Sequence, residues 1–287
     1  MTSLPKTIVL HIGAHKTAST HLQRSLAAAD LPDVAFHGPQ DLRQPGRSLK
    51  ERFRLARGAR VAETRATLAE MAAGAARLVL SEENFAGPLQ SGWGRIPMPL
   101  YPQAADRVSA LCATVARAGG PKVDLCLAIR DPALFLTSAY SQVLKGKRVV
   151  QPEKFIAKNP VAGVDWVDYV QRLRAVPGLG RLTVWRQEDY GVIFPQVCNA
   201  MVGAAPVQPF GERSQQRLSQ AALDAILLAK SQGLPNVVDA AALAHPVAVE
   251  TPAFHLFDAA TRVRSAELYA AQCTALEATS GVTVLRA

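Results

Sequence analysis

The residues best suited to chemistry lie near the start of the chain, in the stretch TIVLHIGAHKTASTHLQ (residues 7–23). It opens with a β-branched apolar run, which is typical of a buried parallel strand, and breaks at Gly13. Lys16 lies in the turn, and Ser19 and Thr20 open an apolar-periodic, helical segment. Backbone N–H groups at the start of a helix and the helix dipole both favour negative charge, and a lysine adds to this preference. The stretch therefore predicts a phosphate-binding loop.

The sequence motif of this loop disfavours a nucleoside triphosphatase. Such a loop needs Gly-x-x-x-x-Gly-Lys-Ser/Thr, whereas Lys16 follows Gly13 too closely and has no glycine before it. The stretch instead resembles the 5′-phosphosulfate loop of the sulfotransferases, written His-Ile-Gly-x-x-Lys-Thr-Gly-Thr-Thr-x-Leu-Gln. The matching residues are His11, Ile12, Gly13, Lys16, Thr17, Thr20, Leu22 and Gln23.

Two positions differ from that loop. Ser19 stands where the family usually has threonine and keeps the hydroxyl, whereas Ala18 stands where the family usually has glycine. Glycine permits positive φ angles and close approach of the backbone to a ligand. Ala18 therefore costs little if its backbone is right-handed helical, and weakens cofactor binding if it is not.

A second stretch, LAIRDPALFLTSAY (residues 127–140), follows an apolar run that predicts another strand. It resembles the 3′-phosphate element of the sulfotransferases, Arg-Asp-Pro-x-x-Arg-x-x-Ser-x-Tyr, although Phe135 replaces the further arginine that many members carry. The matching residues are Arg130, Asp131, Pro132, Ser138 and Tyr140. An arginine fork at a strand end suits a phosphate, and a serine on the following helix can complete the site. The resemblance, softer in residues 182–190, spans residues 7 to about 205 and lacks the C-terminal Arg-Lys-Gly loop of the cytosolic small-molecule sulfotransferases.

This resemblance implies a reaction and a set of binding residues. Sulfotransferases move the sulfuryl group of PAPS (3′-phosphoadenosine 5′-phosphosulfate) to a hydroxyl or amine and release PAP (3′,5′-adenosine bisphosphate), by positioning and electrostatics and without a metal. Lys16 would stabilise charge on the oxygen that bridges phosphate and sulfate. The cofactor-binding residues so implied are Lys16, Thr17, Ala18, Ser19 and Thr20, with His15 beside them, and Arg130 and Ser138 at the second element.

A base must take the proton of the acceptor, and in carbohydrate-type members this is a glutamate shortly after a strand. Glu82 and Glu83 follow the apolar run at residues 77–81. Adjacent residues at a strand end point in different directions, so only one can face the site, and we prefer Glu82 slightly. The alternative bases are three histidines: His15, His21 and His37.

Each candidate also has a plainer interpretation. Arg130 can form a structural ion pair with Asp131 or Glu83, and either glutamate can cap the next segment. Lys16 and the basic residues 145–148 can be solvated surface residues, and Ser138 can simply pack on its helix. His11 can be a hydrogen-bonded core residue, and His15 and His21 can support the loop without touching a ligand. Trp93 and Tyr101 can pack the loop that carries them.

Composition limits the class of protein. An apolar content of 49% with 19% charged residues indicates a globular core, and a net charge of +9 favours an anionic partner. Aromatic residues are few and do not alternate with basic ones, which disfavours nucleic acid. No apolar run reaches the length of about 18–20 residues that a membrane span needs, and the first strand begins too early to leave room for a signal peptide. Four scattered cysteines fit buried thiols. We therefore expect a cytoplasmic protein.

Strands and helices alternate along the chain, which predicts an α/β protein with a mostly parallel sheet of about five strands and helices on both faces. With the resemblance, this is a three-layer fold like that of the P-loop NTPases. The expected strands are residues 7–12, 33–36, 77–81, 122–129 and 181–185, with a further apolar segment at 282–285. The expected helices are residues 20–29, 49–57, 60–75, 103–119, 133–144, 164–176, 189–202, 219–230 and 259–279. We expect a single domain over residues 1–287, with a core at about 5–205 and a helical extension at about 206–287.

These observations predict a PAPS-dependent sulfotransferase that acts on a small-molecule or glycan acceptor, and the positive net charge is compatible with an anionic acceptor. The loop at residues 87–102 and an irregular insert at residues 145–160 are expected to select the acceptor. The alternatives are a nucleotide-dependent kinase or NTPase, and a non-catalytic nucleotide-binding protein on the same scaffold.

Overall fold

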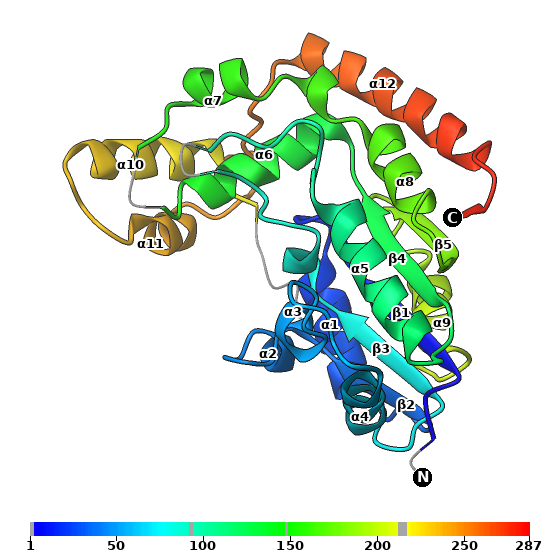
Figure 1. The fold of residues 1–287 in the computed structure, drawn as a ribbon. Coiled ribbons are helices and arrows are strands. Elements are labelled where there is room, and N and C mark those ends of the chain that lie inside the picture. Colours follow the sequence, from blue (N-terminus) through cyan, green and yellow to red (C-terminus); the bar gives the residue numbers. More distant parts are fainter. Residues whose placement is uncertain (1–2, 92–93, 147–148, 212–216) are drawn as a thin grey trace.

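One sheet of six parallel strands forms the centre of the protein (Figure 1). The structure, a computed structural model, describes residues 3–91, 94–146, 149–211 and 217–287. The strands are β1 (Thr7–His11), β2 (Val34–His37), β3 (Arg77–Ser81), β4 (Val123–Ile129), β5 (Leu179–Arg186) and β6 (Val282–Leu285), in the order β2-β3-β1-β4-β5-β6. The five expected strands are confirmed, and the segment at 282–285 adds the sixth.

Both faces of the sheet are buried, as expected of parallel strands. Successive side chains of a strand point to opposite faces, so Ile8 and Leu10 belong to one hydrophobic cluster and Val9 to another. Helices α1 (Ser19–Ala28) and α9 (Phe194–Val202) contribute to the cluster of Val9. The opposite cluster receives side chains from α4 (Val61–Ala72), α5 (Ala104–Arg117), α8 (Trp166–Arg174) and α12 (Ala259–Glu277). The result is the predicted three-layer α/β fold.

Two of the remaining helices, α6 (Pro132–Val143) and α10 (Gln220–Ser231), match the expected helices within one residue at each end. The other elements were not expected or are shorter than expected: α2 (Pro39–Leu42), α3 (Leu49–Arg52), α7 (Pro152–Lys158), α11 (Val237–Ala244) and the short 3₁₀ turns η1 (Glu83–Phe85) and η2 (Val161–Gly163). The insert at residues 145–160 was expected to be irregular, but Pro152 begins a helix there, since proline suits the first helical turn. For the same reason α9 begins at Phe194, just before Pro195, and not at residue 189.

The C-terminal segment is more than a helical extension. β6 pairs with β5 along the sheet, and α12 packs against α6 and α8. Ser265 of α12 accepts a hydrogen bond from the backbone N–H of Ala133 at the start of α6, over 2.9 Å. The four cysteines are buried thiols, as predicted. Within the described parts of the chain, no helix combines the length and apolar character needed to cross a membrane.

The order of the strands brings the predicted site residues together. β3, β1 and β4 are neighbours in the sheet, and their carboxyl ends lie at one edge. The loop with Lys16 follows β1, the two glutamates follow β3, and Arg130 follows β4. After β1 the chain builds β2 and β3 on one side and then β4 and β5 on the other, so this edge is also the topological switch point where ligands bind in such sheets.

Candidate active site

The loop between β1 and α1 has an unusual backbone. Gly13, Lys16 and Ala18 have φ angles of +53°, +69° and +60°. A Cβ atom on Gly13 would lie 2.8 Å from Ser19 Oγ, so only glycine fits there. Ala18 precedes α1 in the left-handed conformation, with ψ at 18°. This is the unfavourable case for an alanine in place of glycine, because the left-handed region costs an L-residue about 1–2 kcal/mol.

Hydrogen bonds hold this loop against β4. The backbone N–H of Ala14 donates to the carbonyl of Ala128 over 3.1 Å, and Arg130 Nη1 donates to the carbonyl of Lys16 over 2.8 Å. The hydroxyl of Thr17 donates to the carbonyl of Ala14 inside the loop. Thr17 is buried and does not line the pocket, so its side chain braces the loop and only its backbone remains a candidate contact.

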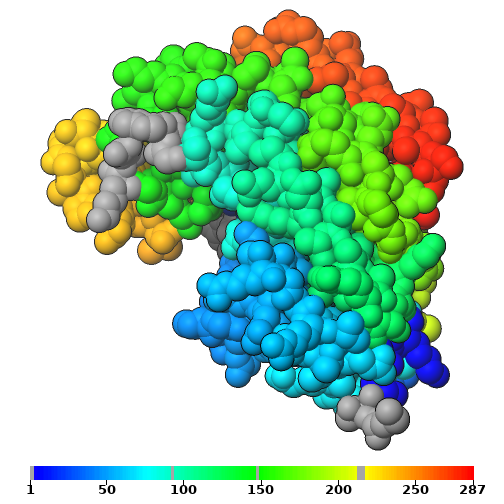
Figure 2. All heavy atoms as spheres, in the orientation of Figure 1, coloured from blue at the N-terminus to red at the C-terminus, as the bar shows by residue number. Residues whose placement is uncertain are grey.

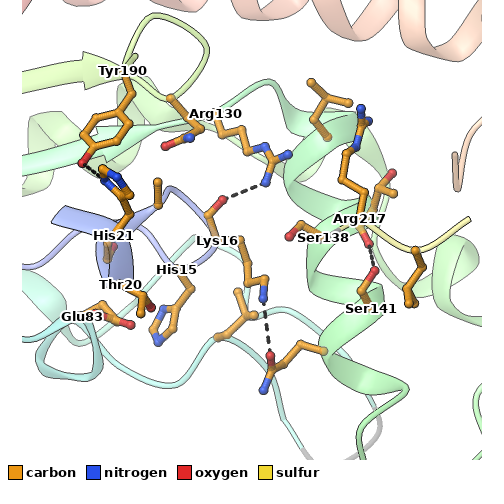
Figure 3. Close-up of a pocket in the computed structure, with 18 of the residues that line it drawn as sticks. His15, Lys16, Thr20, His21, Glu83, Arg130, Ser138, Ser141, Tyr190 and Arg217 are labelled. Atoms are coloured by element: carbon orange, nitrogen blue, oxygen red, sulfur yellow. Dashed lines mark hydrogen bonds between the residues drawn. The ribbon is translucent and has the colours of Figure 1, made fainter. Parts of the chain in front are cut away.

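A pocket of about 1300 Å³ opens at this edge of the sheet. Figure 3 shows Lys16 near its middle, with His21 and Tyr190 on one side and Ser138 and Arg217 on the other. The predicted site residues that line it are His15, Lys16, Ala18, Ser19, Thr20, Glu83, Arg130 and Ser138. Two matches that lie far apart in the sequence thus share one pocket. Glu82 does not line it.

Lys16 carries its charge at the centre of the pocket. Its ammonium donates a hydrogen bond to Gln142 Oε1 of α6 over 3.4 Å. Burial, together with the positive charges of Lys145 and Arg130, lowers the pKa of Lys16 to about 8, although the negative charge of Glu83 acts in the opposite direction. An anion in the pocket would favour the protonated ammonium and raise this pKa.

The first backbone N–H groups of α1 are hydrogen-bond donors that have no acceptor within the helix. The first backbone N–H groups of a helix have no intrahelical partner, and here they belong to Ser19, Thr20 and His21. Ser19 Oγ is buried and has no hydrogen-bond partner among the described residues. A buried hydroxyl without a partner is costly, and a phosphate oxygen would satisfy it. The residues at the start of α1 therefore suit a phosphate group.

Arg130 is fixed at the end of β4 through its backbone. Its carbonyl accepts a hydrogen bond from Trp166 Nε1 over 2.7 Å, and the carboxylate of Asp131 caps α6 by accepting from the N–H of Leu134 over 3.0 Å. Within the described part of the chain, Arg130 forms no ion pair with Asp131 or Glu83, so the plainer interpretation of this arginine is not observed. Tyr140, the last residue of the match, donates to the carbonyl of Val150 over 2.7 Å and belongs to the core.

The carboxylate of Glu82, which does not line the pocket, is held by hydrogen bonds. Its carboxylate accepts two hydrogen bonds from Arg43, over 2.8 and 2.7 Å, and one from the backbone N–H of Asn84 over 2.8 Å. The side chain is only 8% exposed. Glu82 therefore pairs with Arg43 and caps the turn η1.

Glu83 is the glutamate that lines the pocket, which reverses our preference for Glu82. Gln23 of α1 donates to Glu83 Oε2 over 3.0 Å and to Ser81 Oγ over 3.1 Å. Burial alone would raise the pKa of Glu83, but the bond from Gln23 and the charges of His15 and Arg43 bring it below its ordinary value. Glu83 is therefore an ionised carboxylate beside Lys16 and can accept a proton.

The histidines are fixed by hydrogen bonds. His15 pairs with Tyr101 Oη through Nδ1, over 3.1 Å, and burial lowers its pKa. His21 pairs with Tyr190 Oη through Nδ1, over 2.8 Å, and both residues line the pocket. His11 is the buried, hydrogen-bonded residue that we expected, with its pKa lowered to about 4 by burial.

Two further expectations about side chains can be compared with the structure. His37 bonds to Asp41 over 2.6 Å and does not line the pocket, so it is not a candidate base. Tyr101 packs the loop that carries it and orients His15, and does not line the pocket either. Trp93, Lys147 and Arg148 lie outside the described residues.

Other pocket residues carry no motif in the sequence. Arg217 follows the end of the resemblance and lines the pocket beside α6, and Gln142 holds Lys16. Gln23 belongs to the first match, yet only the structure reveals its contact with Glu83. Helix α11 and the residues after it also contribute to the lining.

The described lining of the pocket thus holds five lysines and arginines and three carboxylates, of which Glu83 acts on Lys16. Among the described residues, no group of three His, Cys, Asp or Glu side chains is placed to hold a metal ion. Comparisons of the chain with protein-family models, curated proteins and solved structures gave no match.

Proposed function

We propose that this protein is a sulfotransferase that uses PAPS to sulfate an acceptor hydroxyl and releases PAP. The observation that carries the proposal is the meeting of two anion-binding elements in one pocket, where Arg130 contacts the backbone of Lys16 over 2.8 Å. PAPS has two anionic ends on one nucleoside, and the pocket has a cationic residue for each.

The two ends of the pocket would bind different groups. Lys16, the backbone of Thr17 and Ala18, and the amides and hydroxyls at the start of α1 would hold the 5′-phosphosulfate. Arg130 and Ser138 would hold the 3′-phosphate. Arg217 lies on the same side as Ser138 and adds a second guanidinium there (Figure 3).

The transfer itself needs a proton acceptor and a stabilised leaving group. PAPS supplies the sulfuryl group, and the electron pair of the broken S–O bond stays on the phosphate of PAP. Glu83 would accept the proton of the acceptor hydroxyl, because it is ionised and faces the pocket. Lys16 would stabilise the charge that develops on the leaving oxygen.

Calorimetric titration with PAP tests this proposal. PAP should bind the wild-type protein more tightly than ATP with Mg²⁺, and Lys16→Ala and Arg130→Ala should each weaken PAP binding by about 10- to 100-fold, because each removes a charge-assisted contact. The matched controls are Lys50→Ala and Arg117→Ala, two exposed cations that do not line the pocket. Absent PAP binding, or losses no larger than those of the controls, would overturn the proposal. Preferential binding of ATP with Mg²⁺ would favour a kinase or NTPase instead.

A further inference from the structure

The pocket extends from Lys16 to an apolar wall that the cofactor-binding residues do not need. The wall contains Val238, Ala242 and Leu243 of α11, with Leu89, Leu218 and Phe254. The sequence of helix α11 is VVDAAALA, so its only polar residue is Asp239. Leu243 is 84% exposed, although it lines the pocket.

This wall adjoins the end of the pocket where transfer would occur. Gln142 of α6 contacts the ammonium of Lys16, and Lys145, about one turn further on, forms an ion pair with Asp239 of α11 over 3.4 Å. Lys230 of α10 also donates to the carbonyl of Gly146. These contacts join α10 and α11 to the end of α6. Figure 2 shows a notch beside them, between the gold helices α10 and α11 and the blue segment that carries α2 and α3.

Two of the cations that line the pocket with this wall, Arg43 and Lys145, already have carboxylate partners. Arg43 forms a two-point ion pair with Glu82 and lies 3.5 Å from Glu83. Lys145 is paired with Asp239. A sulfated or carboxylated acceptor would have to compete with these partners and would also meet the negative charge of Glu83. Arg43 and Lys145 are thus already paired, and the proposed function assigns Arg217 to the 3′-phosphate of PAPS, so these cations favour no anionic glycan.

We infer that the acceptor is an uncharged alcohol with a hydrocarbon body, which lies along α11 while its hydroxyl reaches Glu83. This inference rests on the proposed sulfotransferase function and names its acceptor class. Covering the exposed side chain of Leu243 removes apolar surface from water, which favours binding in proportion to the area covered. The paired charges nearby give an uncharged body no electrostatic penalty.

Binding to the PAP-saturated protein tests the inference without requiring turnover. The probes are glucose, hexyl and octyl β-glucoside below their micellar concentrations, and glucose 6-sulfate, so that the sugar is common and the apolar body or the charge varies. Affinity measured by calorimetry should rise with chain length. Leu243→Asp should weaken octyl glucoside binding by about tenfold, because it places a charge on the wall.

The matched control is Leu228→Asp, the same substitution on α10 at a residue that is 61% exposed and does not line the pocket. It should leave octyl glucoside binding unchanged, and neither variant should alter the affinity for PAP. Tighter binding of glucose 6-sulfate, no dependence on chain length, or equal effects of the two variants would overturn the inference and leave the proposed function standing. Failure of the wild-type protein to bind PAP would instead overturn the proposed function, and this inference with it.

Discussion

Ala18 is the residue at which the phosphate loop departs most from an unstrained backbone. Its φ of 60° and ψ of 18° lie in the left-handed region, which glycine adopts without cost. The residue also lines the pocket, and its side chain packs against the hydrophobic cluster that contains Val9. A residue in this conformation persists only because the surrounding structure determines it. Here the following helix and the contact between Arg130 and Lys16 fix the loop.

Replacing Ala18 with glycine should therefore stabilise the protein. Relief of the left-handed alanine is worth about 1–2 kcal/mol, and the greater freedom of glycine in the unfolded chain opposes it by about 0.4–1 kcal/mol. We expect the free energy of unfolding in urea to rise by about 0.5–1 kcal/mol, and PAP to bind a few-fold more tightly.

The matched control for this substitution is Ala73→Gly. Ala73 ends α4 with a φ of 47° and is distant from the pocket lining. It should show a similar gain in stability with no change in PAP affinity. If Ala73→Gly gains stability and Ala18→Gly does not, the strain that we assign to the loop is absent.

Glu82 and Glu83 show how a single position decides between structure and chemistry. Glu82 is tied to Arg43 by two hydrogen bonds, whereas Glu83 receives one from Gln23 and faces the pocket. Glu83→Gln should lower the rate of acceptor sulfation by about 10²- to 10⁴-fold, the usual contribution of a general base, and should leave PAP affinity nearly unchanged.

Glu82→Gln is the informative partner of that variant. It weakens the pair between the buried carboxylate of Glu82 and the partly exposed Arg43, and should reduce the free energy of unfolding by about 1 kcal/mol, with a smaller effect on the sulfation rate per folded molecule. Rates from initial-velocity assays and unfolding curves separate the two effects. A larger rate loss in Glu82→Gln than in Glu83→Gln would assign the base to Glu82.

At the scale of elements, the central sheet could be predicted because its strands are short apolar runs bounded by turn residues. The ends of β1 and β4 carry recognisable matches, so most of the pocket residues at these ends could be named in advance. Which glutamate faces the pocket could not be predicted. That choice depends on Arg43, which lies 39 residues away in sequence and reaches Glu82 only in the folded chain.

Helix α11 and the wall that it forms were also beyond sequence analysis, for a local reason. The helix begins after Asn236, whose φ is 54° and whose side chain makes no capping hydrogen bond, so the usual start signal is missing. Its composition is apolar on nearly every side, and therefore shows no helical periodicity. Arg217 similarly belongs to no motif, and only the return of the chain to α6 brings it to the pocket.

At the scale of the whole molecule, one basic segment of the surface is locally neutralised. Within residues 43–54, the side chains of Arg43, Arg47, Arg52 and Arg54 all form ion pairs with carboxylates. The pocket gathers Lys16, Arg130 and Arg217 at the edge of the sheet instead. Both the net charge of +9 and the local concentration of cations in the pocket therefore favour the binding of an anionic cofactor.

This division of charge predicts that salt weakens binding at one end of the pocket and leaves binding at the other end nearly unchanged. Raising sodium chloride from about 0.05 M to about 0.5 M shortens the range of electrostatic attraction severalfold and should weaken PAP binding by about tenfold or more. Binding of octyl glucoside to the PAP-saturated protein should change little over the same range, because burial of apolar surface is not screened by salt. Calorimetry at both salt concentrations, with PAP kept saturating in the second titration, measures the two responses. If octyl glucoside binding weakened as much as PAP binding, the acceptor end would depend on charge, and the apolar wall of α11 would not be what holds the alcohol.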